Sequence, residues 1–276
     1  MYGHPGRVHR SGATPPGEGG PQCFTDNCGA QPHSPFERIF PMPVSLKRFA
    51  AYAVVLAGFL SLAYGLTTLL AVLNFFNLES APAAEVLSLL KSRGGTVQTA
   101  LISALIGYLL AVPMMLIITQ AAFSDQAGRG MKRHVAFGLV WASLPLRPLW
   151  WGAYLTLIPV LLAAHAPGAD ATMGTATFAS YRMIGAVLNT ATEDVAVNIL
   201  GGTWFVLVGL VISRTRNLPR PLGWIGVVIG ILYLVSSGEL LGFGFGNSGE
   251  IIPLIAGVAG PFWLGAAGFL AVRKVF

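Results

Sequence analysis

Six long apolar stretches constrain this chain more than any other feature of its sequence. They cover residues 49–75, 98–120, 135–163, 195–213, 222–241 and 251–272. A helix needs roughly 20 apolar residues to cross a hydrocarbon core about 30 Å thick, and the fifth stretch reaches that length only through Leu240 and Leu241. Lipid offers backbone amides no hydrogen-bond partners, and the runs are continuous rather than alternating, which excludes a barrel. The sequence therefore predicts an all-α, polytopic membrane helix bundle with six transmembrane helices.

The composition supports the same class. Hydrophobic residues make up 54% of the chain and charged residues only 10%, against about 25% charged residues in soluble domains. This balance excludes an ordinary soluble enzyme, a disordered protein and a nucleic-acid-binding module. The expected partner is the lipid bilayer, with anionic headgroups on the cytoplasmic side, and no nucleic acid.

The first 42 residues differ from the rest because they are rich in Gly and Pro and poor in large apolar side chains. Such a segment cannot bury enough surface to offset its ordering entropy, so residues 1–42 are predicted to be a disordered tail before a membrane domain at 43–276. Met42 opens the sequence MPVSLKRFAAY, which resembles a natural start, so a true start at Met42 is the alternative. Cys23 and Cys28 lack the second ligand pair of a zinc site, and no metal is expected.

Basic residues predict the orientation. One set of loops and ends carries Arg38, Lys47, Arg48, Arg129, Lys132, Arg133, Arg214, Arg216, Arg220, Arg273 and Lys274. The opposite set carries only Lys91, Arg93 and Arg182. The positive-inside rule then places both termini in the cytoplasm. Because the composition also favours a GC-rich bacterial genome, the predicted location is the bacterial plasma (inner) membrane.

Arg147 is the most unusual residue of the apolar stretches. It lies deep in the third stretch, between Pro145 and Pro148. A charge at such a depth is costly and indicates a functional site with a partner. The candidate partners are Glu193, Asp194, Asn198 and Glu239. In the alternative, the first part of the stretch lies at the inner interface and the Arg147 side chain reaches the headgroups.

The acidic pair Glu193–Asp194 precedes the fourth stretch. Adjacent residues of a helix point about 100° apart, so the two carboxylates are not a facing acid–base pair. We expect them to mark the outer end of the fourth span, at a helix N-terminus. Two outer segments near 83–90 and 178–188 have apolar faces at helical spacing. They either lie flat on the membrane or extend the neighbouring spans.

Small residues recur at short spacing in the last two stretches. Small faces let helices approach closely in lipid, so the fifth and sixth spans are predicted to pack tightly on each other. The same pattern also allows a homo-oligomer. The residues concerned are Gly226, Gly230, Gly257, Gly260, Gly265 and Gly268.

Three segments carry a family resemblance: SYRMIGAVL at 180–188, ISRTRNLPRPLGWIGVVIGILYLV at 212–235 and FWLGAAGFLAVRK at 262–274. They resemble an uncharacterised bacterial family of six-helix integral membrane proteins, of the domain-of-unknown-function kind. The resemblance covers most of residues 47–274. It implies a six-span fold, establishes no activity and transfers no functional residue.

Function is less constrained than fold. The leading hypothesis is a non-enzymatic membrane protein with a structural or regulatory role. The first alternative is a small transporter or permease with a polar pocket around Arg147. The second is a membrane-embedded enzyme, although the sequence lacks the usual catalytic motifs, such as H-E-x-x-H and G-x-S-x-G. No catalytic residue and no cofactor are expected.

Overall fold

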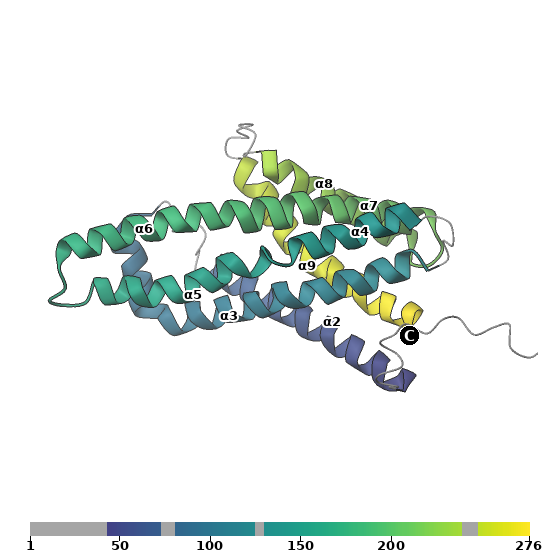
Figure 1. The fold of residues 1–276 in the computed structure, drawn as a ribbon, viewed down its shortest axis with the longest axis horizontal. Coiled ribbons are helices and arrows are strands. Elements are labelled where there is room, and N and C mark those ends of the chain that lie inside the picture. Colours follow the sequence, from purple (N-terminus) through teal and green to yellow (C-terminus); the bar gives the residue numbers. More distant parts are fainter. Residues whose placement is uncertain (1–42, 73–80, 125–129, 239–247) are drawn as a thin grey trace, which may run out of the picture. The chain divides into compact units, whose positions relative to one another are not determined.

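The computed structural model describes residues 43–72, 81–124, 130–238 and 248–276, and within these ranges it contains helices and no strand (Figure 1). The all-α class predicted from the sequence is confirmed. The helices are α2 (Val44–Thr67), α3 (Ala83–Ala122), α4 (Gly130–Ser143), α5 (Arg147–Ala164), α6 (Ala171–Asn189), α7 (Gly202–Arg214), α8 (Arg220–Ser236) and α9 (Ser248–Val275). Two π-helical segments continue them: η1 (Thr68–Val72) after α2, and η3 (Thr190–Gly201) between α6 and α7.

Five of the helical segments are long and apolar enough to cross a membrane: Val44–Leu70, Ala83–Ala122, Gly130–Ala164, Ala171–Arg214 and Leu254–Val275. The sixth, α8, is apolar but has only 17 residues, or roughly 25 Å at 1.5 Å per residue. The predicted fifth span at 222–241 therefore ends earlier than expected, and its last residues lie outside the described ranges. The chain is a multi-pass membrane protein.

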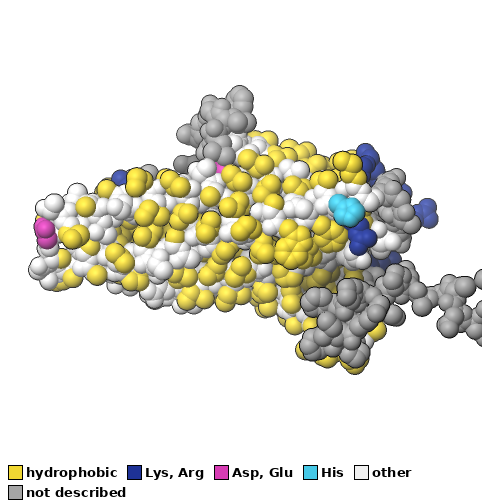
Figure 2. All heavy atoms as spheres, viewed as in Figure 1, with side chains coloured by type: hydrophobic (Ala, Val, Ile, Leu, Met, Phe, Trp, Pro, Cys, Tyr) yellow, Lys and Arg dark blue, Asp and Glu magenta, His cyan; other side chains and the backbone are white. Residues whose placement is uncertain are grey.

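Neighbouring segments run in opposite directions, so the start of α2 lies beside the end of α9 (Figure 1). Two ring contacts fix this antiparallel pair: Tyr52 with Phe269 at 5.0 Å and Phe59 with Phe262 at 5.3 Å between centroids. The basic residues that begin or end the helices consequently gather at one end of the bundle, which we call the basic end (Figure 2). They are Lys47, Arg48, Lys132, Arg133, Arg214, Arg216, Arg220, Arg273 and Lys274.

Two of the segments are far longer than the sequence predicts. Helix α3 has 40 residues and the continuous segment α6–η3–α7 has 44, so each extends roughly 60 Å, about twice the hydrocarbon thickness. The outer amphipathic segment near 178–188 extends the neighbouring span. The segment near 83–90 is set off from the rest of α3 by a kink at Arg93, whose backbone is not helical (φ −129°, ψ 22°). The predicted helix start beside Glu193 and Asp194 is wrong, because no proline interrupts the segment between Ala171 and Arg214.

The closest helix contact joins α7 and α8. A Cβ atom on Gly223 would lie 2.5 Å from the backbone nitrogen of Ser213, and one on Gly209 would lie 2.7 Å from the Gly223 carbonyl oxygen. At the other end of the pair, a Cβ on Gly230 would lie 2.7 Å from the Gly202 carbonyl oxygen. The two backbones are therefore in direct contact, which only glycine allows.

Five of the six glycines singled out in the last two spans lie at three different helix interfaces. Gly226 faces Trp263 of α9 and Gly260 faces Tyr233 of α8, so these two join the fifth and sixth spans. Gly230 instead faces α7. Gly265 and Gly268 pack against Phe59 and Val55 of α2, and a Cβ on Gly257 would meet nothing within 4 Å.

Candidate functional site

The site begins at a break in a membrane segment. Residues 144–146 separate α4 from α5, and Pro145 and Pro148 flank Arg147 there. A proline removes a backbone donor and clashes with the preceding turn, so the helix cannot continue through this sequence. Thr192 of η3 donates a hydrogen bond of 3.0 Å to the Leu146 carbonyl oxygen, which ties η3 directly to the break. The positive end of α5 thus begins inside the bundle.

Arg147 is the first residue of α5, and only 5% of its surface is exposed. Its Nε donates to the Ser143 hydroxyl at 3.0 Å, and Nη2 donates to the Met115 sulfur at 3.6 Å. The guanidinium carbon lies 6.0 Å from the centre of the Tyr108 ring. The side chain is therefore surrounded by protein atoms, as in the first of the two alternatives raised by the sequence.

One of the candidate acidic partners, Glu193 of η3, lies in the same cluster. The Tyr108 hydroxyl donates to Glu193 Oε1 at 3.2 Å. Tyr108 also lies beside the Arg147 guanidinium, and Tyr233 of α8 lines the same cavity as these two residues. One cation, one carboxylate and two phenols thus come together from four helical segments. We call Arg147, Glu193, Tyr108 and Tyr233 the polar centre.

The other candidate partners form a separate arrangement or cannot be described. Asn198 is buried and its side-chain amide donates to Asp194 Oδ1 at 3.4 Å, so these two residues make a pair along η3. Glu239 lies outside the described residues. The structure therefore brings together Arg147 and Glu193 of the residues chosen from the sequence.

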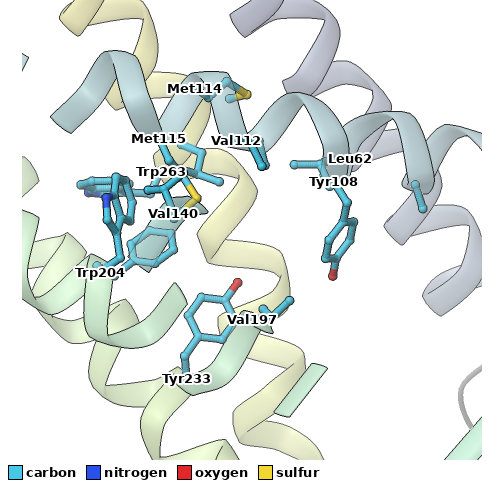
Figure 3. Packing of buried hydrophobic residues seen from close by; sticks show 14 of the residues in the cluster. Leu62, Tyr108, Val112, Met114, Met115, Val140, Val197, Trp204, Tyr233 and Trp263 are labelled. Carbon is cyan, nitrogen blue, oxygen red and sulfur yellow. The ribbon is translucent and has the colours of Figure 1, made fainter. Parts of the chain in front are cut away.

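A cavity of about 40 Å³ lies beside the polar centre. One water needs roughly 10–15 Å³ of such volume, so the cavity has room for about three waters or a ligand of a few heavy atoms. Its walls come from every membrane segment: Leu62, Leu66, Tyr108, Ala111, Met115, Arg147, Val197, Gly201, Phe205, Tyr233, Gly257, Pro261 and Leu264. Figure 3 shows Tyr108 and Tyr233 extending from α3 and α8 into the interior beside Val197. Most of the lining is apolar, and its charged group is Arg147.

The π-helical form of η3 places Glu193, Val197 and Gly201 on the side of the site. These residues are spaced by four, close to the period of a π-helix, and the last two line the cavity. Segments of this kind are rare and frequently occur at functional sites. Gly201 leaves room for the guanidinium, since a Cβ there would lie 3.6 Å from Arg147 Nη2.

The two tyrosines were missed from the sequence. Tyrosine is common in membrane helices, where it usually lies at the interface, and only the packing shows that these two hydroxyls reach the interior. Their position within apolar stretches was the signal available. Within the described ranges, no group of three or more His, Cys, Asp or Glu side chains could hold a metal ion.

Comparison with known families gives one result. A family model described as "Domain of unknown function (DUF4386)" matches residues 52–270, which include every helix that lines the cavity. This match confirms the resemblance to a family of the domain-of-unknown-function kind. No curated protein and no solved structure matches the chain.

Proposed function

Starting from the fact that the chain belongs to the DUF4386 family, we propose that it binds a small polar solute at the polar centre and carries it across the bilayer. The observation that carries this proposal is the burial of Arg147 beside a cavity to which every membrane segment contributes. The proposed location is the bacterial inner membrane, with the basic end facing the anionic headgroups of the cytoplasmic leaflet.

Depth supports a role for Arg147 in the middle of the membrane. Its guanidinium touches Met115 and Tyr108 of α3. These residues precede Ala122, the end of α3 at the basic end, by seven and fourteen positions. At 1.5 Å per residue, the guanidinium therefore lies roughly 10–20 Å from the basic end, near the centre of a hydrocarbon core about 30 Å thick.

A purely structural role explains this arrangement less well. A charge at the centre of a bilayer costs at least about 3 kcal/mol, and a buried ion pair can often be replaced by apolar residues without loss of stability. The interrupted segment α4–α5 adds a second argument. In transporters, broken helices place their positive ends at anionic groups of the solute near the membrane midplane. Both features favour the transporter alternative over the structural one.

The test of transport is uptake into proteoliposomes at pH 8, using radiolabelled urea as a neutral probe and radiolabelled formate as an anionic probe, with the rate of protein-free vesicles subtracted. We expect the wild-type protein to accelerate uptake of at least one probe. Arg147→Gln should lose that acceleration at least tenfold, whereas Arg133→Gln, at the exposed start of α4, should retain it. The proposal would be overturned if the wild-type protein accelerated the uptake of neither probe, or if Arg147→Gln and wild type gave equal uptake rates.

Orientation is tested separately by cysteine labelling in intact bacterial cells. In a background with Cys23 and Cys28 replaced by Ser, Ala169→Cys lies between α5 and α6, and Arg216→Cys lies in the connection between α7 and α8 at the basic end. A membrane-impermeant maleimide should label position 169 and leave position 216 unlabelled until the cells are opened. The reverse pattern would contradict the proposed orientation.

A further inference from the structure

We propose that the solute is a small monocarboxylate anion bound by Arg147 and that one proton is bound with it, on Glu193. This inference rests on the proposed function, and it names the solute class and the coupling of the same site. Its argument uses the charge of Arg147, the size of the cavity, the neighbouring carboxylate and the hydroxyl that joins them.

Two sources of positive charge meet at the cavity. One is the guanidinium of Arg147, and the other is the N-terminus of α5, whose first residue is Arg147 itself. Among the described residues, no side chain caps the first turn of α5. The helix dipole at such an end favours an anion. The site therefore suits a negatively charged solute better than a cation.

The guanidinium is further suited to bind a carboxylate. It has five N–H donors in a planar fork that matches two carboxylate oxygens. The structure gives Nε a hydrogen bond to Ser143 and Nη2 a contact with the Met115 sulfur. Within the contacts of the described residues, the remaining donors suffice for a bidentate carboxylate at the cavity.

The cavity limits the size of the solute. A volume of about 40 Å³ corresponds to roughly three waters, so formate, with three heavy atoms, fits without rearrangement. Leu66, Ala111 and Val197 provide an apolar wall, which suits the hydrogen or the short alkyl group opposite a carboxylate. Larger carboxylates require the helices to move apart.

Charge balance requires the proton. In the empty site, the positive charge of Arg147 and the negative charge of Glu193 offset each other. A bound anion would add a second negative charge in a medium that screens poorly, and two like charges in such a site resist ionisation together. A proton taken from water onto a Glu193 carboxylate oxygen restores neutrality. The loaded site then holds the arginine cation, the anion and a neutral carboxylic acid, and release of the solute returns the proton to water.

Tyr108 provides the link between the two events. Its hydroxyl donates to the Glu193 carboxylate, and Tyr108 is also one of the residues that line the cavity. When Glu193 is protonated, its own O–H can donate to the Tyr108 oxygen, and the Tyr108 O–H can turn to the bound anion. Tyr108 therefore acts as a positioning residue that transmits the protonation of Glu193 to the anion site.

Among the described residues, the titratable groups near Glu193 come from several helices. Tyr108 of α3, Tyr233 of α8 and Arg147 of α5 belong to the polar centre. Asp194 neighbours Glu193 on η3 and accepts from Asn198. The cavity residues supplied by α2, α7 and α9 do not titrate: Leu62, Leu66, Phe205, Gly257, Pro261 and Leu264. Ser143 of α4 and Thr192 of η3 complete the described polar neighbours of the break.

The test is calorimetric titration of the purified, detergent-solubilised full chain with sodium formate, with formamide as the neutral probe of similar shape. Runs in two buffers of different ionisation enthalpy report the number of protons taken up. For the wild type we expect one proton per formate and a Kd that rises up to tenfold per pH unit between pH 6 and 8. Formamide should bind at least tenfold more weakly.

Two isosteric variants separate the roles of the adjacent carboxylates. Glu193→Gln should bind formate without proton uptake and with a Kd independent of pH, whereas Asp194→Asn should retain the pH dependence of the wild type. Arg147→Gln should lose formate binding at least tenfold. A pH dependence that persists in Glu193→Gln, or that is lost in Asp194→Asn, would overturn the assignment of the proton.

The outcomes distinguish this inference from the proposed function. If urea is taken up in an Arg147-dependent way but formate does not bind, the carboxylate class is wrong and transport stands. If formate binds with one proton but neither probe is transported, transport is wrong and the binding site stands. Equal binding of formate and formamide would overturn the anion class.

Discussion

The α7–α8 interface and the polar centre lie in the same bundle and are built in opposite ways. At the interface, Gly209 and Gly223 bring two backbones into direct contact and leave no space between them. At the polar centre, Arg147 and the two tyrosines border a cavity of about 40 Å³. Glycine is present in both places, but Gly201 and Gly257 leave room beside the cavity and do not close a helix contact.

This difference separates the frame of the protein from its site. A backbone contact between α7 and α8 has no alternative packing, because any side chain larger than hydrogen would meet backbone atoms. The polar centre, in contrast, joins segments through single hydrogen bonds such as those from Tyr108 to Glu193 and from Thr192 to Leu146. We therefore expect substitutions at the interface to affect stability and substitutions at the polar centre to affect binding.

The largest effect is expected for Gly223→Ala. The new methyl group would lie 2.5 Å from the Ser213 nitrogen and 2.7 Å from the Gly209 carbonyl oxygen, so the helices would have to separate, at a cost of about 3 kcal/mol or more. Chemical denaturation in detergent measures the loss. The control is Gly152→Ala in α5, where a Cβ meets nothing within 4 Å and the helix should gain up to about 1 kcal/mol. Equal stability of the two variants would contradict the close α7–α8 contact.

Gly201→Ala should weaken binding with little effect on stability, in contrast to Gly223→Ala. Its Cβ would lie at ordinary contact distance, 3.5 Å from the Ala196 carbonyl oxygen and 3.6 Å from Arg147 Nη2. We expect the free energy of unfolding to change by less than about 1 kcal/mol, because the added methyl group makes ordinary van der Waals contacts and no clash. Formate binding should weaken about tenfold, or about 1.4 kcal/mol, because the methyl group occupies the cavity beside the guanidinium. Unchanged binding in the calorimetric titration would place the solute elsewhere.

Thr192→Val tests the break between α4 and α5. The substitution removes the donor to the Leu146 carbonyl oxygen while keeping the shape of a buried side chain. The expected loss of unfolding free energy is about 1 kcal/mol, the typical net contribution of one hydrogen bond. A loss below the error of the denaturation curves would show that the break needs no support from η3.

The smallest effect is expected at the basic end. Arg133 Nη2 donates to Gln120 Oε1 at 2.6 Å, but both side chains are accessible to solvent. Exposed polar pairs contribute little, so Arg133→Gln should change the free energy of unfolding by less than about 0.5 kcal/mol. A larger change would mean that the connection between α3 and α4 depends on this contact.

The sequence predicts those parts of the fold that depend on a single local property, such as hydropathy or the presence of proline. Hydropathy alone located the helices, and the proline pair around Arg147 marked the segment that breaks. Helix length was less predictable, because the outer parts of α3 and α6 carry polar residues that hydropathy does not assign to a span, and α3 continues past a kink at Arg93. Gly202, Gly209 and Gly223 were missed because the contact repeats every seven residues, from Gly202 to Gly209 and from Gly223 to Gly230. The spacing of four between Gly226 and Gly230 drew attention to α9 instead.

The site was predictable only in part. A charge within an apolar stretch identifies Arg147 without any structure, because lipid makes such a residue costly. Its neighbours depend on the rotation of other helices, which sequence periodicity does not fix. Glu193 and Asp194 were equivalent candidates in the sequence, and the packing of η3 is what directs Glu193 toward Tyr108.

The central claim is that Arg147 and Glu193 serve a solute and are not required for the fold. The most direct test is the free energy of unfolding of the double variant Arg147→Met/Glu193→Gln, which removes both charges together and keeps side-chain volume similar. The account predicts a stability equal to or greater than that of the wild type, since removing both charges together also removes the cost of keeping them away from water. A loss of about 3 kcal/mol or more would contradict it and show that the pair holds the bundle together.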